Sequence, residues 1–453
     1  MAPDNHDRQE LLQLLSERRW GELCQHLRAM DPADTADFLE EIGPDERELV
    51  FERFDPETAS DVLVELEPYY VDDVTEDMPS EELANYADEM APDDAADFLN
   101  EFDADESARI LSRMQEPDRV ADLLRHESDT AGHVMTTELC AVPATATVEE
   151  TRKALAPLDL TDPVLFVYVL EPKSRRLEGI VSLQDLFTAK HTERAGDIAD
   201  REFVAAFTYE DQEAVALKFR KYDVWEMPVL DYSGRLKGRI TVDDIMDVIH
   251  AEADEDLAMM VGAPDIETEE GSPFKIARLR LPWLLITMFG GLINSLIIKS
   301  ILDVTDIVVV AIFVPAIMAM GGNTGVQSAA IAVRGIALGY NAYTRLLRIV
   351  GREISVGVFM GLVCGTATAV VLWSIVLIYA PDTGGLSATT LALTVGTAMC
   401  TAMIFASCFG SIVPITMHRL GADPAVASGP LITTSNDLAA SLIYFATCVL
   451  ILR

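Results

Sequence analysis

The chain has 453 residues, 50% of them hydrophobic, and a formal net charge of −40. So large a negative charge argues against nucleic acid as a partner. The six cysteines, at positions 24, 140, 364, 400, 408 and 448, show no paired metal-ligand spacing, and we expect them to be reduced packing residues. The sequence lacks the phosphate-binding pattern GxxxxGK[ST], which argues against a pump that hydrolyses ATP. We therefore expect that the protein is not an enzyme.

The charge is divided sharply between two parts of the sequence. Residues 1–270 hold 68 acidic and 24 basic side chains, whereas residues 271–453 hold 6 and 10. The second part contains five apolar stretches long enough to cross a bilayer, near 281–302, 307–333, 354–380, 388–416 and 425–452. We therefore expect a soluble region followed by an integral membrane domain. Acids are spread over the whole soluble region, as in a protein adapted to a high-salt cytoplasm, so most of them should simply face water.

Eight of the ten basic residues of the membrane part fall in three places that lie on one side of the bilayer. They precede the first span, separate the second from the third, and separate the fourth from the fifth: Lys275, Arg278, Arg280, Arg334, Arg345, Arg348, Arg352 and Arg419. The positive-inside rule then predicts a multi-pass protein of the cell membrane with its N-terminal half in the cytoplasm and Arg453 outside. The first residues, MAPDNHDRQE, are charged and polar, so we expect no signal peptide.

The first predicted domain, residues 1–130, consists of short amphipathic helices that repeat. The segment that begins at Asp31 matches the one that begins at Ala91, and a weaker copy begins at Asp55. Six residue pairs agree in register: Pro32/Pro92, Asp34/Asp94, Ala36/Ala96, Asp37/Asp97, Phe38/Phe98 and Leu39/Leu99. Such repeats predict a helical solenoid, because no single unit can bury its own apolar stripe. A protein-binding scaffold is its simplest function.

Two further domains, residues 131–194 and 195–249, are copies of one α/β unit. Strand-like segments lie at 165–170, 178–183, 227–231 and 237–241. The copies align at Leu177/Leu236, Gly179/Gly238, Val181/Ile240, Ser182/Thr241 and Asp185/Asp244. This duplication resembles a tandem pair of CBS (cystathionine-β-synthase-type) domains. The resemblance implies a regulatory module that binds an adenine nucleotide or responds to ions, and it leaves the binding of ATP open.

An acidic connecting helix, assigned to residues 242–270, follows the second copy. Its apolar stripe is Ile245, Met246, Ile249, Leu257 and Met260. Acids occupy much of the rest: Asp243, Asp244, Asp247, Glu252, Asp254, Glu255 and Asp256. These acids repel one another unless cations lie between them, which makes the helix a candidate switch. The alternative is a charged linker whose acids face water.

The second span carries an unusual polar and glycine-rich run. We expect Pro315 and the run Gly321, Gly322, Asn323, Gly325 and Gln327 to interrupt an apolar helix. Its carbonyls can then face an aqueous path together with the two amide side chains. A tight crossing of helices through small residues is the alternative, and periodicity alone does not decide between them.

The last span carries one carboxylate, Asp437, predicted near its middle, where an ionised acid costs at least about 2.5–3.5 kcal/mol. The polar residues Thr433, Thr434, Ser435 and Asn436 directly precede it. A break is expected two turns earlier, at Ser428, Gly429 and Pro430. The cluster predicts a cation site in a permeation path; the alternative is an acid hydrogen-bonded to a neighbouring helix for packing.

These motifs together resemble the MgtE-type magnesium channels. The signatures are PAIMAMGGNTGVQS in the second span and DPAVASGPLITTSND before the acid of the fifth, in a chain ordered as solenoid, CBS pair, acidic helix and five-helix transmembrane domain (residues 275–453). The resemblance implies a homodimer in membrane lipid, with the second and fifth spans of both subunits around the pore and Asp437 holding Mg²⁺. It further implies that the acidic helix is a plug, closed by cytoplasmic Mg²⁺.

The resemblance also assigns residues by motif. The metal-binding acids would be Asp437 in the pore and, for gating, Asp211, Glu213, Asp223, Asp244, Asp247, Glu252, Glu255, Asp256 and Asp423. The pore-lining residues would be Ala311, Pro315, Gly321, Gly322, Asn323, Gly325, Gln327, Gly429, Pro430, Thr433, Thr434 and Ala440. Val326, Gly429 and Thr433 depart from the family pattern, and in the solenoid Asp94 and Asp97 are candidates for sensing acids.

Ion chemistry agrees with these assignments. Mg²⁺ gives up its water reluctantly, so its site should offer few oxygens and room for hydrating waters. Two symmetry-related Asp437 carboxylates repel each other when empty and favour a doubly charged ion. Two hypotheses compete with a Mg²⁺ channel: an ion-coupled secondary transporter or exporter in which Asp437 relays protons, and a membrane-anchored nucleotide sensor. Discrimination against Mn²⁺, Co²⁺ and Ca²⁺ stays open.

Overall fold

The computed structural model describes residues 5–76, 78–156, 164–261, 273–305, 311–337, 343–379, 385–424 and 429–452. They divide into two compact units, Met1–His250 and Ala251–Arg453. The boundary falls inside the acidic helix, so each unit is described by itself.

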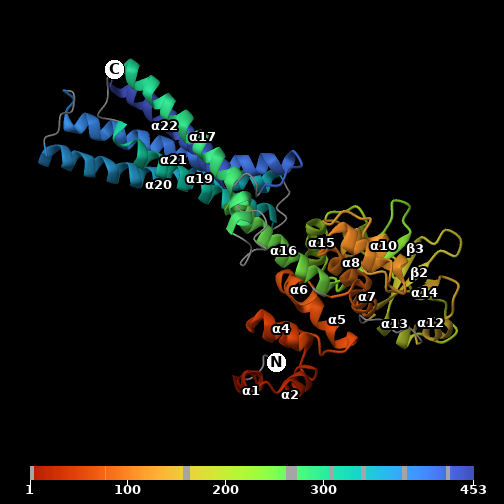
Figure 1. Cartoon of the computed structure of the whole chain (residues 1–453). Helices are drawn as coiled ribbons and strands as arrows, with labels where there is room; N and C mark the ends of the chain where they lie inside the picture. Colours follow the sequence, from red (N-terminus) through yellow and green to blue (C-terminus); the bar gives the residue numbers. More distant parts are fainter. Residues whose placement is uncertain are drawn as a thin grey trace. The chain divides into compact units, whose positions relative to one another are not determined.

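The first unit begins with ten short helices, as the repeats predict (Figure 1). They are α1 (Asn5–Ser16), α2 (Trp20–Leu27), α3 (Pro32–Glu41), α4 (Pro44–Phe51), α5 (Pro56–Glu65), α6 (Pro68–Thr75), α7 (Ser80–Glu89), α8 (Pro92–Asn100), α9 (Ala104–Leu111) and α10 (Pro117–Leu123). Most start at a proline, whose fixed φ and missing N–H suit the first helical position. The matched residues Pro32 and Pro92 open α3 and α8, so the predicted solenoid is confirmed.

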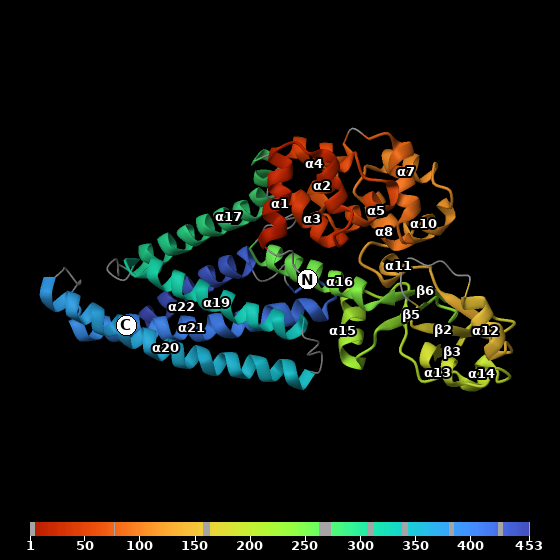
Figure 2. The same cartoon turned by 90° about the horizontal axis from the view of Figure 1, so that it is seen from below.

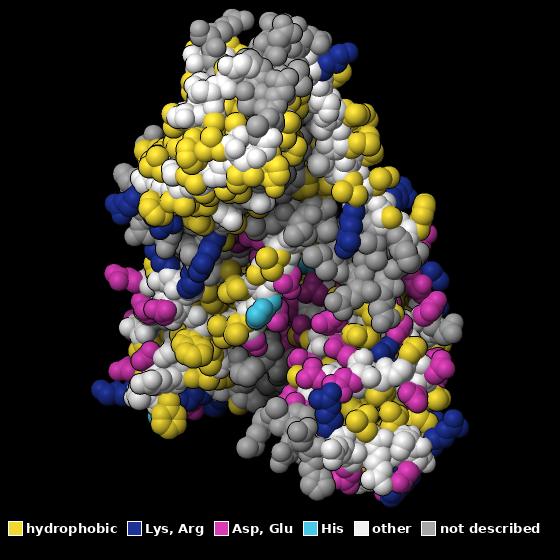
Figure 3. Space-filling view, turned by 90° about the vertical axis from the view of Figure 1, so that its left-hand side faces the viewer, with side chains coloured by type: hydrophobic (Ala, Val, Ile, Leu, Met, Phe, Trp, Pro, Cys, Tyr) yellow, Lys and Arg dark blue, Asp and Glu magenta, His cyan; other side chains and the backbone are white. Residues whose placement is uncertain are grey.

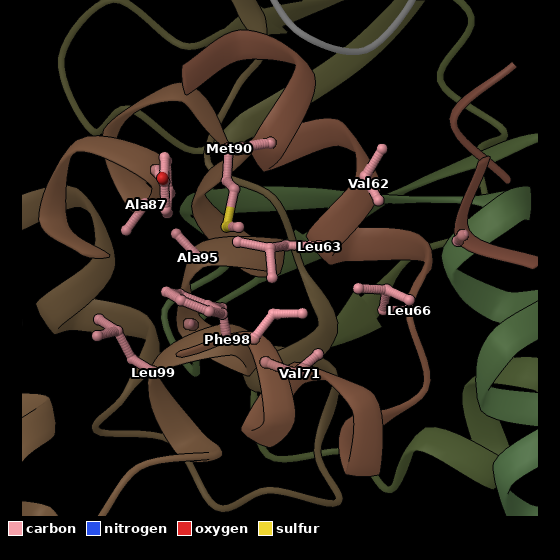
Figure 4. Close-up of a cluster of buried hydrophobic side chains, with 14 of the residues drawn as sticks. Val62, Leu63, Leu66, Val71, Ala87, Met90, Ala95, Phe98 and Leu99 are labelled. Carbon is pink, nitrogen blue, oxygen red and sulfur yellow. The ribbon is translucent and has the colours of Figure 1, made fainter. Parts of the chain in front are cut away.

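The solenoid has a continuous apolar core. Figure 4 shows Leu63 of α5 gathered with Phe98 and Leu99 of α8 and with neighbouring apolar side chains. The same core continues into the second CBS copy, where it includes Val215 and Val229. The first CBS copy has a separate small core, so the solenoid and the second copy form the more closely joined pair.

The two CBS copies each contain a three-stranded sheet. Their elements are α11 (Ala131–Val134), β1 (Cys140–Pro143), α12 (Val148–Leu155), β2 (Phe166–Leu170), β3 (Leu177–Ser182), α13 (Leu183–Thr188), α14 (Ala195–Ile198), β4 (Ala206–Phe207), α15 (Gln212–Tyr222), β5 (Glu226–Leu230) and β6 (Leu236–Thr241). The sheet orders are β1-β2-β3 and β4-β5-β6, each with one parallel and one antiparallel pair. Val169 pairs with Gly179 and Val229 with Gly238, which confirms the duplication. The first strand of each copy was not predicted.

The acidic helix α16 spans Val242–Val261. Its predicted apolar stripe is only partly buried: Ile245 is 2% exposed, whereas Met246, Ile249 and Leu257 are exposed. The stripe was therefore predicted on the wrong side of Ile245, because the buried residues next to it are Val248 and Ala258. The side chain of Met260 and residues 262–270 lie outside the described part.

In the part of the second unit that the structure describes, the long helices that begin after α16 are α17 (Pro273–Thr305), α19 (Val314–Ala337), α20 (Tyr343–Tyr379), α21 (Ala388–Arg419) and α22 (Pro430–Leu452). Among the described residues, four segments are long and apolar enough to cross a membrane: Arg280–Ile301, Leu347–Tyr379, Ala388–Arg419 and Pro430–Ile451. The helix of the predicted second span, α19, is not among them, because glycine, amide and hydroxyl residues interrupt its apolar sequence.

Helix α21 is central in this unit. It packs against α19, α20 and α22, while α22 also packs against α17 and α19 (Figures 1 and 2). Figure 3 shows hydrophobic side chains over this unit and acidic side chains over the other. All six cysteines are free thiols. The predicted fold class, a soluble helical and CBS region joined to a helical membrane domain, is confirmed.

Candidate functional site

The two polar motifs of the membrane domain face each other where α19 crosses α22. A Cβ atom added to Gly322 would lie 3.2 Å from Oδ1 of Asp437 and 3.5 Å from Cγ2 of Thr433. A Cβ atom added to Gly321 would lie 3.1 Å from the Cβ of Ala440. The backbone of α19 therefore approaches the carboxylate of α22 directly, and two consecutive glycines permit this approach.

Asp437 is the eighth residue of α22. At 1.5 Å per residue its Cα lies about 10 Å along the helix from Pro430 and about 22 Å from Leu452. This differs from the predicted position near the middle of the span, because the described helix starts at Pro430 and not at Ala425. Asp437 is partly exposed within the single chain, so its carboxylate remains accessible from one side.

Helix α19 is continuous through its glycine run, so the predicted interruption was wrong. Pro315 occupies the first turn, where its missing N–H breaks no helical hydrogen bond. Of the two alternatives, the structure has the tight crossing: a Cβ atom on Gly410 of α21 would collide with the carbonyl oxygen of Gly325. At the other predicted break, Gly429 is buried and its carbonyl oxygen accepts the N–H of Thr433 at 3.1 Å, while Ser428 lies outside the described residues.

The remaining predicted pore residues of α19 lie on another face of the helix. Asn323 and Gln327 are exposed within the single chain, whereas the three glycines of the run are buried. Pro315 is exposed as well, and Ala311, just before the helix, is partly exposed. The structure thus brings the glycines to Asp437 and leaves the two amide side chains on an uncovered face.

Two polar side chains beside Asp437 are buried with no hydrogen-bond partner among the described residues. They are the Thr434 hydroxyl and both polar atoms of the Asn436 amide, which is 0% exposed. Thr434 packs so closely on Gly290 of α17, and Asn436 on Gly325, that a Cβ atom at either glycine would collide with it. Asn436 belonged to the polar cluster predicted around Asp437, but it was not named among the pore-lining residues.

The predicted sensing acids of the second CBS copy lie at the ends of α15. Asp211 caps the helix by accepting the N–H of Ala214 at 3.2 Å, and Glu213 follows in the first turn. Asp223 ends the helix in a left-handed conformation with φ of 53°. Asp211 and Asp223 are exposed, so each offers carboxylate oxygens to a cation.

Further acids meet where α16 begins. Asp244 accepts the N–H and the hydroxyl of Thr241 at 2.9 and 2.6 Å, and so fixes the start of the helix. Partial burial and then the neighbouring Asp243 raise the pKa of Asp247. Burial and then Asp247 raise the pKa of Glu65, an acid of α5 that the sequence analysis missed. The carboxylates of Glu65 on α5 and Asp247 on α16 therefore lie close enough to repel each other.

A second group of acids lies within the membrane unit, at the end of α16. Burial, then Asp423 and then Glu252 raise the pKa of Asp256 to about 6. Asp423 is the predicted acid at the mouth of the fifth span, and it is exposed. Glu255 is exposed on the adjacent position of the helix. Two other predicted gating acids, Asp423 and Glu252, thus lie close enough to Asp256 to affect its pKa.

The two candidate acids of the solenoid differ in their surroundings. Oδ1 of Asp97 lies 3.0 Å from Nε2 of His133, and this contact raises the pKa of the imidazole. Asp97 therefore joins α8 to the first CBS copy in this structure. Asp94 is partly exposed and makes its own contacts on the same helix.

No three His, Cys, Asp or Glu side chains converge tightly enough to hold a metal ion within the described ranges. Instead, Asp247 raises the pKa of Glu65 and Asp423 raises that of Asp256, after the larger effect of burial in each case, so these acids lie near each other two by two. Mg²⁺ suits such pairs, because it keeps several of its waters and needs only one or two carboxylates from the protein.

Comparisons with known proteins agree with this arrangement. Residues 314–447 match the family model described as a divalent cation transporter, and residues 30–129 match the MgtE intracellular N domain. Residues 131–192 and 195–251 match the CBS domain.

Two curated relatives are similar over most of the chain. The magnesium transporter MgtE of Enterococcus faecalis is 35% identical over 341 residues, which cover 75% of this chain and 73% of that one. The magnesium transporter MgtE of Bacillus subtilis is 34% identical over 332 residues, which cover 73% and 71%. The solved cytosolic domain of the Mg²⁺ channel MgtE in complex with ATP is 32% identical, with a TM-score of 0.49, and covers 53% of this chain and 99% of that one.

Proposed function

Because the chain belongs to the MgtE family of magnesium transporters, we propose that it is a channel that lets Mg²⁺ into the cell along α19 and α22. The observation that carries this proposal is the approach of the Asp437 carboxylate to the bare backbone of Gly322. A lone acid beside backbone and hydroxyl groups offers few ligands, so the ion keeps most of its waters there. The charge of Asp437 would favour a doubly charged ion, and the close backbone of α19 would limit the size of the ion that passes.

A homodimer completes this pore. Asn323 and Gln327 lie on a face of α19 that nothing in the described chain covers, and uncovered amide groups are costly in contact with lipid. A second copy related by a twofold axis would cover that face and bring two Asp437 side chains toward one ion. Topology follows from the basic loops, with the soluble region inside and Arg453 outside.

The acidic clusters supply the gate. Glu65 faces Asp247, and Asp256 faces Asp423, so like charges oppose each arrangement until a cation neutralises them. When cytoplasmic Mg²⁺ rises, it would bridge these acids and hold α16 in the closing position; when it falls, repulsion releases the helix. Asp211, Glu213, Asp223, Asp244, Glu252 and Glu255 would contribute oxygens to the same sites.

Transport into liposomes tests the pore. Purified full-length protein is reconstituted and Mg²⁺ entry is followed with an enclosed fluorescent indicator. Asp437→Ala should abolish entry, whereas Ser411→Ala, which removes a hydroxyl bonded only within its own helix, should leave it unchanged. Intact entry in Asp437→Ala would refute the pore. Entry that requires a H⁺ or Na⁺ gradient would favour the secondary transporter instead.

Protease protection tests the gate. In high KCl, which screens non-specific charge, millimolar Mg²⁺ should protect the full-length protein, and Asp247→Ala or Glu255→Ala should weaken that protection. Protection by KCl alone would mean that these acids serve only solubility.

ATP is the further ligand that we assign to the CBS pair, because residues 131–192 and 195–251 match the CBS domain and the resemblance to tandem CBS pairs implies a module that binds an adenine nucleotide. Equilibrium dialysis of the full-length protein with labelled ATP tests this assignment. No saturable binding at millimolar ATP would remove it.

A further inference from the structure

A buried carboxylate lies in the membrane unit outside the proposed ion path. Glu353, on α20, is only 3% exposed, and its Oε2 accepts the hydroxyl of Ser328 on α19 at 3.1 Å. The hydroxyl of Ser407 on α21 contacts that of Ser328 at 3.0 Å and donates to the backbone carbonyl of Glu353 at 2.7 Å. Three helices therefore meet in one cluster of polar contacts, which we call the Glu353 joint: one hydroxyl bonds the carboxylate, the other bonds the backbone carbonyl of the same residue, and the two hydroxyl oxygens touch.

The surrounding backbone is shaped to admit this joint. A Cβ atom on Gly357, one turn after Glu353, would lie 2.7 Å from the Cβ of Ser407, so α21 can approach α20 only because that position is a glycine. Ser328 and Ser407 are also buried, at 2% and 0% exposure. The basic group nearest to the carboxylate is Arg352, whose Nε lies 3.8 Å from Oε1 and whose side chain is largely exposed. The carboxylate is therefore held by one buried hydroxyl, that of Ser328, and by a long contact with the exposed Arg352 side chain.

The joint lies on the same short stretch of α19 as the ion site. Gly322 faces Asp437, Gly325 meets α21, and Ser328 enters the joint, so these contacts follow at intervals of three residues. The distance from Gly322 to Ser328 is about 9 Å along the helix, which is less than two turns. A helix this short is stiff, so a shift of α19 at Ser328 also changes its spacing from α22 at Asp437.

We propose that Glu353 is a positioning residue for Mg²⁺ selectivity, because the bond between its carboxylate and Ser328, with the bond from Ser407 to its backbone carbonyl, fixes how closely Gly322 approaches Asp437. This inference rests on the proposed pore at Asp437. Mg²⁺ demands short, regular coordination and keeps its waters, whereas Ca²⁺ tolerates a looser and larger site. A loosened crossing should therefore lose preference for Mg²⁺ before it loses conduction.

The test compares Mg²⁺ and Ca²⁺ entry into liposomes containing full-length variants. Glu353→Ala should lower the ratio of the initial Mg²⁺ rate to the Ca²⁺ rate by about three- to tenfold, the effect expected from losing one interhelical hydrogen bond. Ser407→Ala should shift the ratio in the same direction. Glu353→Gln, which keeps an oxygen that can accept from Ser328, should restore it. A folding defect lowers both rates together, so the ratio is insensitive to the amount of active protein.

Ser411→Ala is the matched control, since Ser411 is as buried as Ser407 on the same helix but bonds only that helix. An unchanged ratio in Glu353→Ala, or an equal shift in Ser411→Ala, would overturn the positioning role. Asp437→Ala is measured alongside these variants. Intact transport in it refutes the pore itself, whereas lost transport there with an unchanged ratio in Glu353→Ala refutes only the role of Glu353.

Discussion

Lowering the pH should close the gate without Mg²⁺, because Asp256 meets Asp423 in the described arrangement. The raised pKa of Asp256, about 6 against an ordinary value of 3.8, means that this arrangement favours the protonated acid. The contribution of this protonation to the stability of the arrangement is therefore fully present below pH 3.8. It is lost as the pH rises from 3.8 to about 6, and it does not change further above that. A change from pH 7.5 to 5.5 crosses the upper part of this window.

The size of the effect follows from the same two pKa values. With a pKa of about 6 when α16 is in place and 3.8 when it is released, the change from pH 7.5 to 5.5 favours the placed helix by about 0.8 kcal/mol. That corresponds to about a fourfold rise in the ratio of closed to open protein. It is an upper limit, because solvent screens a partly exposed carboxylate.

Papain protection of the full-length protein in EDTA measures this ratio at both pH values. Asp256→Asn should be more protected than the wild type at pH 7.5 and should lose most of the response to pH; a residual response is expected from Asp247 and Glu65. Asp254→Asn, which changes an exposed acid two residues away, is the control and should behave as the wild type does. If Asp256→Asn responds to pH as strongly as the wild type, the reasoning from Asp256 fails.

Three other variants probe packing. Gly322→Ala should lower the rate of Mg²⁺ entry by about fivefold, because the added Cβ atom would lie 3.2 Å from the carboxylate of Asp437. The control Gly291→Ala adds a Cβ atom in open space and should not change the rate. Equal rates in the two variants would contradict the close approach. Gly325→Ala should lower the free energy of unfolding, measured by thermal unfolding in detergent, by about 1–3 kcal/mol, because the added Cβ atom would collide with Asn436. The second substitution Asn436→Ala should recover most of this loss. If the effects of the two substitutions simply add, the contact is contradicted. Glu226→Ala should lower the free energy of unfolding by about 3–5 kcal/mol, because it removes the carboxylate that lies 3.2 Å from the buried Arg239. Glu226→Gln should lower it less. Scanning calorimetry that shows no loss of stability in Glu226→Ala would contradict a buried ion pair.

Sequence patterns predicted elements better than they predicted contacts. The prolines that open α3 and α8 are local signals, and so are the duplicated strands, so both could be found without the structure. The glycine run of α19 was harder, because glycine favours both a broken helix and a close crossing; only the partner helix decides. Glu65 and Glu353 were missed for a similar reason. Their significance depends on Asp247 and on Ser328 and Ser407, residues far away in sequence.

The low hydropathy of α19 is explained by the contacts that its glycine and polar residues make. Its buried glycines approach Asp437 and α21, Ser328 enters the Glu353 joint, and Asn323 and Gln327 lie on the uncovered face. A helix surrounded by lipid needs apolar side chains around its circumference, whereas a helix between its own bundle and a water-filled path does not. The low hydropathy of α19 therefore agrees with the proposed place of this helix beside an ion path. Helices α20, α21 and α22, which pack against it, are more apolar.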